Sequence, residues 1–243
     1  MAFGRGPKIV KDGLVLMLDA ANPKSYPGTG TTWNDLSGNS HTGTLFNSPS
    51  FSSGNPSYFS FDYSNDYATV AGMSSVSYSS GITADVWYYN GGGTVLGVYR
   101  GVVNNGDSGF RFGGFDIRLG REDYFGGGNN GTIFNSRFTC GTENVANSDS
   151  LSMYANVNEW HNYVSTYDNT TIRVYKDGVL FDSKTHSTGG ALVDTGNSTT
   201  IGLSNGTSEY LDGRLATVKI FNRPLTATEV LQNYNSTKSR FGL

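Results

Sequence analysis

The segment Ile172-Arg-Val-Tyr-Lys-Asp-Gly-Val-Leu-Phe181 carries the clearest fold signal in the chain. Two runs rich in β-branched, aromatic and other apolar residues flank Asp177-Gly178. An Asp-Gly pair supplies the positive φ angles that a tight turn between antiparallel strands requires. The segment therefore predicts a β-hairpin whose strands cover residues 171–176 and 179–183.

Strand patterns recur on both sides of this hairpin, with turn residues between them. In residues 82–89 the apolar alternation places Ile82, Ala84, Val86 and Tyr88 on one face of a strand. Short runs of this kind, separated by turns, are typical of an antiparallel β-sandwich. The other predicted strands cover residues 13–19, 58–62, 67–70, 94–99, 110–119, 160–167, 199–203 and 215–222.

The composition agrees with one all-β domain. The 243 residues include 15 Tyr, 14 Phe and 33 Gly, and only 15% of them are charged. Aromatic side chains suit half-buried strands, and glycine suits the turns between strands. The net charge of −3 leaves no basic stripe for phosphates, so we expect no nucleic-acid partner.

The two ends of the chain differ from the sandwich, which we assign to residues 11–225. Residues 1–10 form an extended basic arm, which is either a frayed terminus or a docking arm. Thr226 and Glu229 form a capping-box pattern, so residues 226–243 should contain a short helix followed by a tail.

Several classes of protein are excluded at this stage. No apolar run approaches the ~18 residues of a membrane span, so we expect no membrane insertion. No signal-peptide pattern opens the chain. A lone Cys140 excludes an internal disulfide, and we expect a buried thiol that acts as a small hydrophobic side chain.

Four stretches, in this order along the chain, resemble the laminin G-like branch of the concanavalin A-like lectin/glucanase superfamily. The resemblance implies a two-sheet antiparallel jelly roll in which the run 13–19 lies beside the run 215–222. The stretches are Asp12–Asn22 with Thr32–Asn39 and Gly43–Leu45; Phe61–Asp62 with Asp66–Val70; Glu159–Asp168 leading into Ile172–Gly178; and Tyr210–Thr226 with Glu229 and Asn233–Tyr234.

The two ends resemble, more narrowly, domains in structural proteins of tailed bacteriophages. The cues are Gly4–Pro7 ahead of Asp12–Leu14, the run Leu18–Gly28 and the ending Lys238–Leu243. The resemblance implies a virion surface protein (a capsid decoration, fibre or tail component) that is assembled in the host cytoplasm. Its expected partners are other virion proteins, and a homo-oligomer is possible. The expected docking residues are Phe3, Arg5, Lys8, Ile9, Arg240, Phe241 and Leu243.

The resemblance also points to sugar binding, because lectin sites stack a sugar ring on an exposed aromatic side chain. Tyr124 and Phe125, beside a glycine-rich loop at residues 126–131, are the candidates for a host-surface glycan. A free carbohydrate-binding module is therefore an alternative function. Trp87 and Trp160 lie at strand positions, where a structural role is expected.

Calcium is the one cofactor that the resemblance suggests. Asp62, Asp66 and Asp212 are candidate ligands at the sandwich rim, because calcium accepts scattered carboxylate and carbonyl oxygens. The competing interpretation is that these aspartates only build turns.

A glucanase-like hydrolase is the second alternative, and we expect no enzymatic activity. That chemistry needs two carboxyl groups about 5–5.5 Å apart on one sheet face for retention. The chain has five glutamates, and no two of them lie within ten residues of each other. His161, beside Trp160, is expected to be a structural histidine.

Overall fold

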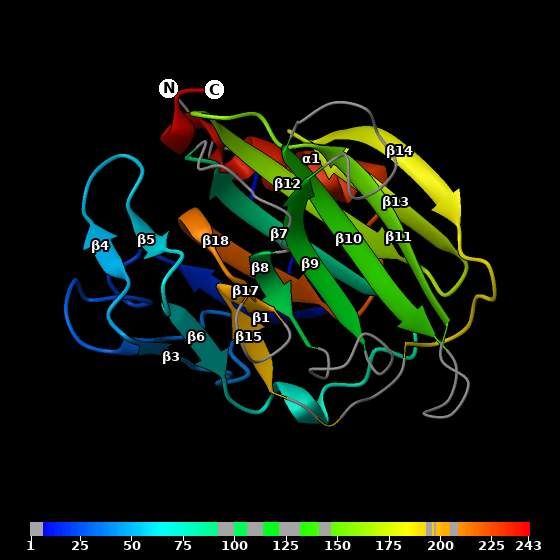
Figure 1. The fold of residues 1–243 in the computed structure, drawn as a ribbon, viewed down its shortest axis with the longest axis horizontal. Helices are drawn as coiled ribbons and strands as arrows, with labels where there is room; N and C mark the ends of the chain where they lie inside the picture. The colour runs from blue at the N-terminus through cyan, green and yellow to red at the C-terminus, as the bar shows by residue number, and fades with distance from the viewer. Residues whose placement is uncertain are drawn as a thin grey trace, which may run out of the picture.

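The computed structural model describes residues 7–91, 100–105, 114–121, 132–140, 147–192, 196, 198–204 and 209–243. Two large antiparallel sheets, called sheet A and sheet B below, pack face to face. Figure 1 shows the sheets one in front of the other, with β8 to β11 of sheet B nearest the viewer. The predicted all-β jelly-roll sandwich is confirmed.

Sheet A has the strand order β14-β13-β12-β7-β18-β5-β4. The strand β18 lies at its centre: β7 pairs along one side, while β5 and β1 share the other side. The strands are β1 (Leu14–Asp19), β4 (Ser50–Ser52), β5 (Tyr58–Asp62), β7 (Ile82–Tyr89), β12 (Trp160–Tyr167), β13 (Thr171–Lys176), β14 (Val179–Thr185) and β18 (Asp212–Phe221).

Sheet B has the strand order β11-β10-β9-β8-β15-β6-β3-β2. Its strands are β2 (Thr32–Trp33), β3 (Gly43–Phe46), β6 (Tyr67–Val70), β8 (Arg100–Asn104), β9 (Phe115–Arg121), β10 (Thr132–Cys140), β11 (Asn147–Tyr154) and β15 (Thr199–Ile201). A separate pair joins β16 (Leu203–Ser204) to β17 (Glu209–Tyr210), and a 3-10 turn, η1, covers Met73–Ser75.

The main core lies between the two sheets. Ile82, Ala84, Val86 and Tyr88 all point into it, as the alternation in β7 predicts. Most of the other large side chains of this core are fully buried aromatics. They include Trp33, Phe59, Phe61, Phe115, Phe134, Phe138, Tyr163 and Tyr167.

A second layer covers part of the outer face of sheet A. It consists of residues 8–10, α1 (Ala227–Thr237) and the 3-10 turn η3 (Lys238–Phe241). Val10 and Val230 pack with outward-facing side chains of the sheet, such as Val164 and Phe221, in a smaller hydrophobic cluster. The amide of Val10 donates to Asn233 Oδ1 of α1 at 2.9 Å. The sequence immediately before β1 is therefore held against the C-terminal helix.

The local sequence signals correspond to the structure. The capping box forms, with Glu229 N donating to Thr226 Oγ1 and Thr226 N donating to Glu229 Oε2. In the β13–β14 hairpin Asp177 and Gly178 have φ angles of 51° and 79°. A Cβ on Gly178 would come within 3.0 Å of the Leu231 and Tyr234 side chains, so this turn also lets α1 approach closely.

The strand predictions need correction, mainly in sheet B. No strand was expected at β8, β10 or β11, of which β11 forms the edge of the sheet, nor at the short strands β2, β3 and β4. The strand expected at residues 110–119 begins at Phe115 among the described residues and extends to Arg121. The strand expected at 94–99 and the loop expected at 126–131 lie outside the described residues. No helix in the described part of the chain is both long and apolar enough to cross a lipid bilayer.

Candidate functional site

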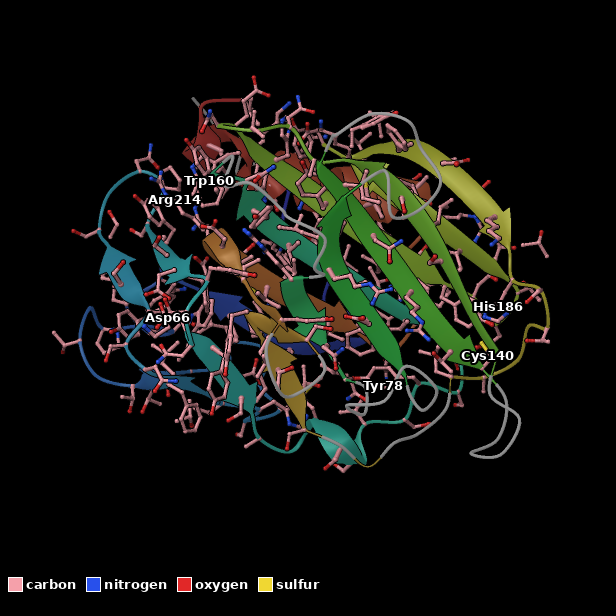
Figure 2. The ribbon with its side chains drawn as sticks, viewed as in Figure 1. Asp66, Tyr78, Cys140, Trp160, His186 and Arg214 are labelled. Atoms are coloured by element: carbon pink, nitrogen blue, oxygen red, sulfur yellow. The ribbon has the colours of Figure 1, made fainter. Side chains whose placement is uncertain are left out.

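A row of large polar and aromatic side chains crosses the outer face of sheet A beyond the edge of the helical layer. Ser60 of β5 is the register partner of Arg214 of β18. Arg214 pairs with Tyr89 of β7, which pairs in turn with Trp160 of β12. Four neighbouring strands therefore bring residues from distant parts of the sequence into one line. Figure 2 shows Trp160 and Arg214 at the same end of the molecule.

Aromatic rings surround the guanidinium group of Arg214. Its Cζ lies 4.5 Å from the centroid of the Tyr89 ring and 5.0 Å from that of Tyr58, which lies two residues before Ser60. The Trp160 ring packs 5.6 Å from each of these tyrosine rings. We call Tyr58, Tyr89, Trp160 and Arg214 the aromatic–arginine surface. All four side chains are half-buried, so each still presents part of its surface to solvent.

The C-terminal turn supports this surface from the side. The Phe241 ring stacks on Trp87 at 3.7 Å with an interplanar angle of 3°, and it lies 5.3 Å from Trp160. Arg240 anchors the same turn through two hydrogen bonds of 2.7 and 2.9 Å to the carboxylate of Asp19. Phe241 is therefore a positioning residue for Trp160.

Several polar groups of this surface have no partner among the described residues. Within the described residues, Arg214 makes no ion pair or hydrogen bond, and neither do the Tyr58 and Tyr89 hydroxyls or the Trp160 indole N–H. A guanidinium group alone offers five N–H donors. Half-exposed rings beside available donors are what a site for a sugar ring requires, because the rings contact its apolar face and the donors bind its hydroxyls.

The sequence analysis placed the sugar site elsewhere. Tyr124 and Phe125 lie outside the described residues, so the structure does not test them. Trp87 is fully buried, as expected of a structural residue. Trp160 was also expected to be structural, but its side chain is half-exposed on the outer face and so is also available to a ligand. Alternation in β7 could have revealed the site, since Tyr89 must face opposite to Tyr88.

Some of the expected docking residues already have contacts within the chain. Arg240 and Phe241 make the contacts with Asp19 and Trp87 described above. Lys8 is exposed, although its carbonyl accepts a 2.7 Å hydrogen bond from Gln232 Nε2. Ile9 is half-buried, Leu243 is exposed, and Phe3 and Arg5 lie outside the described residues. Docking onto a partner stays a prediction for all of these residues.

The structure brings together two of the three calcium candidates. Asp62 and Asp66 lie close enough to influence each other's ionisation. The third, Asp212, is the register partner of Asp62, but its Oδ2 binds Arg100 Nη1 at 2.9 Å. In the part of the chain that the structure covers, no three acidic, histidine or cysteine side chains gather as metal ligands. Among these residues, the three-carboxylate calcium site is not formed.

The buried carboxyl of Asp66 gives a pH-dependent prediction. Burial, and secondly the negative charge of Asp62, raise the pKa of Asp66 from 3.8 to about 6. The folded state then binds this proton more tightly than the unfolded state. The contribution of Asp66 to stability is therefore present below about pH 4 and is lost as the pH rises through about 6.

We expect Asp66→Asn to raise the free energy of unfolding by about 1 kcal/mol at pH 7 relative to the wild type. At pH 4 the gain should vanish, because the wild-type side chain is then neutral as well. Urea denaturation of both proteins at the two pH values measures this difference. An equal gain at both pH values would show that ionisation of Asp66 is not its cause.

The structure gives the described candidate catalytic groups structural roles. Nδ1 of His161 lies 2.7 Å from Asp177 Oδ2 in the hairpin turn, and its Nε2 lies 3.0 Å from Glu159. Glu229 binds Arg223 and caps α1, and Arg223 holds the pKa of Glu229 at about 2. A glycosidase acid needs the opposite shift, towards a raised pKa.

The outer face of sheet B carries a carboxylate that is also neutralised. Asp116 Oδ2 lies 3.2 Å from Arg118 Nη1, and Asp116 Oδ1 accepts a 3.1 Å hydrogen bond from Ser204. Arg118 Nε in turn donates to Asn135 at 3.2 Å. These side chains are almost fully buried. They form a hydrogen-bonded polar network and not a pair of free carboxyl groups.

Cys140 lies beside a histidine at the opposite end of the molecule from Trp160, as Figure 2 shows. His186 Nδ1 accepts from the amides of Thr188 and Gly189, so its proton is on Nε2, which donates to the carbonyl of Phe138 at 3.2 Å. A ring in this tautomer cannot take the thiol proton of Cys140. The predicted burial of Cys140 is confirmed, and the thiol is not activated by His186 as a base.

Two facing antiparallel sheets with an aromatic surface outside one of them define a lectin-like β-sandwich. The chain belongs to the concanavalin A-like lectin/glucanases superfamily, which matches residues 61–231. No curated protein matches the chain.

Several solved structures with a similar fold are binding domains of toxins. The binding domain of Paraclostridial Mosquitocidal Protein 1 has a TM-score of 0.68 and 20% identity, over 93% of this chain and 52% of that chain. The receptor binding domain of botulinum neurotoxin type G has a TM-score of 0.62 and 18% identity, over 92% and 51%. The ligand binding domain of serotype D, solved with N-acetylneuraminic acid, has a TM-score of 0.66 and 15% identity, over 93% and 51%. The chain spans about half the length of these structures.

Proposed function

We propose that this domain is a non-enzymatic, glycan-binding component of a bacteriophage virion surface. The observation that carries glycan binding is the aromatic–arginine surface, where three half-exposed rings surround donors that have no partner in the described part of the chain. A sugar ring would pack against Trp160 and the tyrosines and accept hydrogen bonds from the unused donors. Hydrophobic contact would supply affinity, and the hydrogen bonds would select the sugar.

A binding role fits the acidic groups better than hydrolysis does. Asp116, Glu159 and Glu229 are each engaged with a basic or amide side chain. The glucanase alternative would need two free carboxyl groups converging on a cleft. Release of reducing sugar from a β-glucan by the purified domain would revive that alternative.

The virion assignment is supported by the phage-like motifs at the two ends of the sequence. Residues 8–10 and the C-terminal helix and turn pack on or beside sheet A, and Lys8 and Leu243 are exposed. A partner subunit could contact them without covering sheet B. The alternative of a free carbohydrate-binding module uses the same aromatic–arginine surface and differs only in lacking a place in a particle.

The structural neighbours include examples of both kinds of partner. One is in complex with N-acetylneuraminic acid, and another, a botulinum neurotoxin binding domain, is in complex with rat synaptotagmin II. Proteins of this fold can therefore bind either a sugar or a protein receptor. The unused donors and rings around Arg214 favour the sugar for this chain.

Trp160→Ala should weaken binding to any glycan that the wild type retains by tenfold or more, because truncating a central aromatic at a binding site costs about 2 kcal/mol or more. A glycan array followed by titration calorimetry measures the effect. Phe46→Ala is a matched control: Phe46 is 38% exposed and stacks on Tyr67 of sheet B, away from the site. Unchanged affinity in Trp160→Ala would remove this surface from the proposal.

The place in the virion is tested separately. Mass spectrometry of purified phage particles should detect the chain, and a reconstruction of the particle should place it on the outer surface. Its absence from the particles, together with glycan binding by the free domain, would favour the carbohydrate-binding module.

A further inference from the structure

We propose that the aromatic–arginine surface selects saccharides that carry a carboxylate, and that Arg214 is the residue that selects them. This inference rests on the proposed function, because it names the ligand class of the same site.

Arg214 differs from five other arginines of the described chain in how its charge is used. Each of those five forms an ion pair with a carboxylate. The pairs are Arg100–Asp212, Arg118–Asp116, Arg173–Asp168, Arg223–Glu229 and Arg240–Asp19, at 2.6 to 3.2 Å. The described residues provide no such partner for Arg214, whose described contacts are the faces of two tyrosine rings.

The absence of an ion pair is not due to a lack of nearby acidic residues. Asp212 lies two positions before Arg214 on β18, and Asp62 lies opposite Asp212 on β5. Asp212 pairs with Arg100 instead, and the exposed Asp62 accepts from the backbone amide of Ser64. The Tyr58 and Tyr89 rings therefore hold the guanidinium in a position where neither carboxylate pairs with it.

A guanidinium group held in this way is ready for an external anion. Its planar fork matches the two oxygens of a carboxylate, and contact with aromatic faces leaves N–H groups at the edge of the plane free. Partial burial lowers the local dielectric, so one ion pair here contributes more than it would in open solvent. A neutral sugar would leave this charge unpaired, which favours an acidic sugar over its neutral counterpart.

The rings and the remaining donors make a saccharide the best carrier of that carboxylate. Trp160 and the tyrosines offer apolar faces, and their N–H and O–H groups suit the hydroxyls of a pyranose ring. A carboxylate on a sugar ring would place the anion and the stacking face within one ligand, as the 4.5 to 5.6 Å spacing of these groups requires.

The test uses an array that contains sialylated, uronate-containing, sulfated and neutral glycans. The strongest acidic hit is then compared with its carboxyl methyl ester by calorimetry. We expect the ester to bind the wild type at least tenfold more weakly than the acid. Arg214→Gln should lower the affinity for the acid at least tenfold and the affinity for the ester by much less, so that the preference for the acid is lost. Arg214→Lys should lie between, because an ammonium keeps the charge and loses the bidentate geometry.

The outcomes separate this inference from the proposed function. Equal binding of acid and ester, or an acid affinity unaffected by Arg214→Gln, overturns the selectivity while glycan binding stands. Preference for sulfated glycans over carboxylated ones also overturns it. No retained glycan of any class overturns the proposed function itself. Arg214 makes no ion pair in the described structure, so Arg214→Gln should keep the wild-type melting temperature and serve as a folded variant.

Discussion

Replacing Lys219 by methionine should lower the free energy of unfolding by about 3–5 kcal/mol, because it leaves a charge buried without its partner. Lys219 Nζ lies 3.0 Å from Asp85 Oδ1, and each side chain is 1% exposed. The pair sits on the outer face of sheet A beneath α1. Asn162 and Asn233 also donate to the Asp85 carboxylate, at 2.8 and 3.3 Å. These amides remain in the variant, but they do not neutralise the carboxylate.

Urea denaturation followed by circular dichroism measures this loss, and Lys24→Met, at an exposed position, should change stability by less than about 0.5 kcal/mol. The double variant Asp85→Asn/Lys219→Met removes both charges and keeps an amide that can accept from Asn162 and Asn233. We expect it to be more stable than Lys219→Met alone, because the uncompensated charge on Asp85 is no longer present. Strict additivity of the two single changes would contradict the interpretation of a buried, coupled pair.

Trp87→Ala should be similarly damaging, with a loss of about 3–5 kcal/mol, because it empties a site that is fully buried. The indole ring stacks on Phe241 and Tyr234, and its Nε1–H donates to Thr237 Oγ1 at 3.0 Å. The variant therefore removes the platform on which α1 and η3 rest. Since Phe241 also supports Trp160, we expect weaker glycan binding as a second consequence.

Hydrogen exchange of residues 227–241, measured alongside denaturation, should show lost protection in Trp87→Ala. Trp87→Phe keeps a ring at this site and loses the hydrogen bond to Thr237, so its cost should be smaller, about 1–2 kcal/mol. Full protection of α1 in Trp87→Ala would show that the helix does not depend on this contact.

Signals that lie within a few residues of each other could be predicted from the sequence. The Asp177-Gly178 turn, the capping box of α1 and the alternation in β7 each depend on neighbouring residues, and each is confirmed. The resemblance supplied the pairing of β1 with β18, which no local pattern reveals because about two hundred residues separate them. Family membership and fold were therefore accessible before the structure.

Features that depend on contacts with neighbouring strands or with the facing sheet could not be predicted from the sequence. In β10 the inward positions include Ser136, whose hydroxyl contacts Ser165 of the facing sheet, so the apolar alternation is interrupted. The outward positions of the same strand include Asn135, a polar residue that is buried and forms hydrogen bonds with Arg118 and Ser152 of the neighbouring strands. The aromatic–arginine surface was missed for a related reason. Its four members come from four strands, and only their register makes them neighbours.

The central position of β18 has a consequence for how the domain is made on the ribosome. Synthesis delivers β5 and β7 early, but the strand that joins them emerges only after residue 212. Until then the nascent chain holds two incomplete halves, each with an open edge where β18 will lie, and such edges can pair with foreign strands. Because residues 212–241 complete the sheet and then cover it, sheet A cannot close until this segment has left the ribosome.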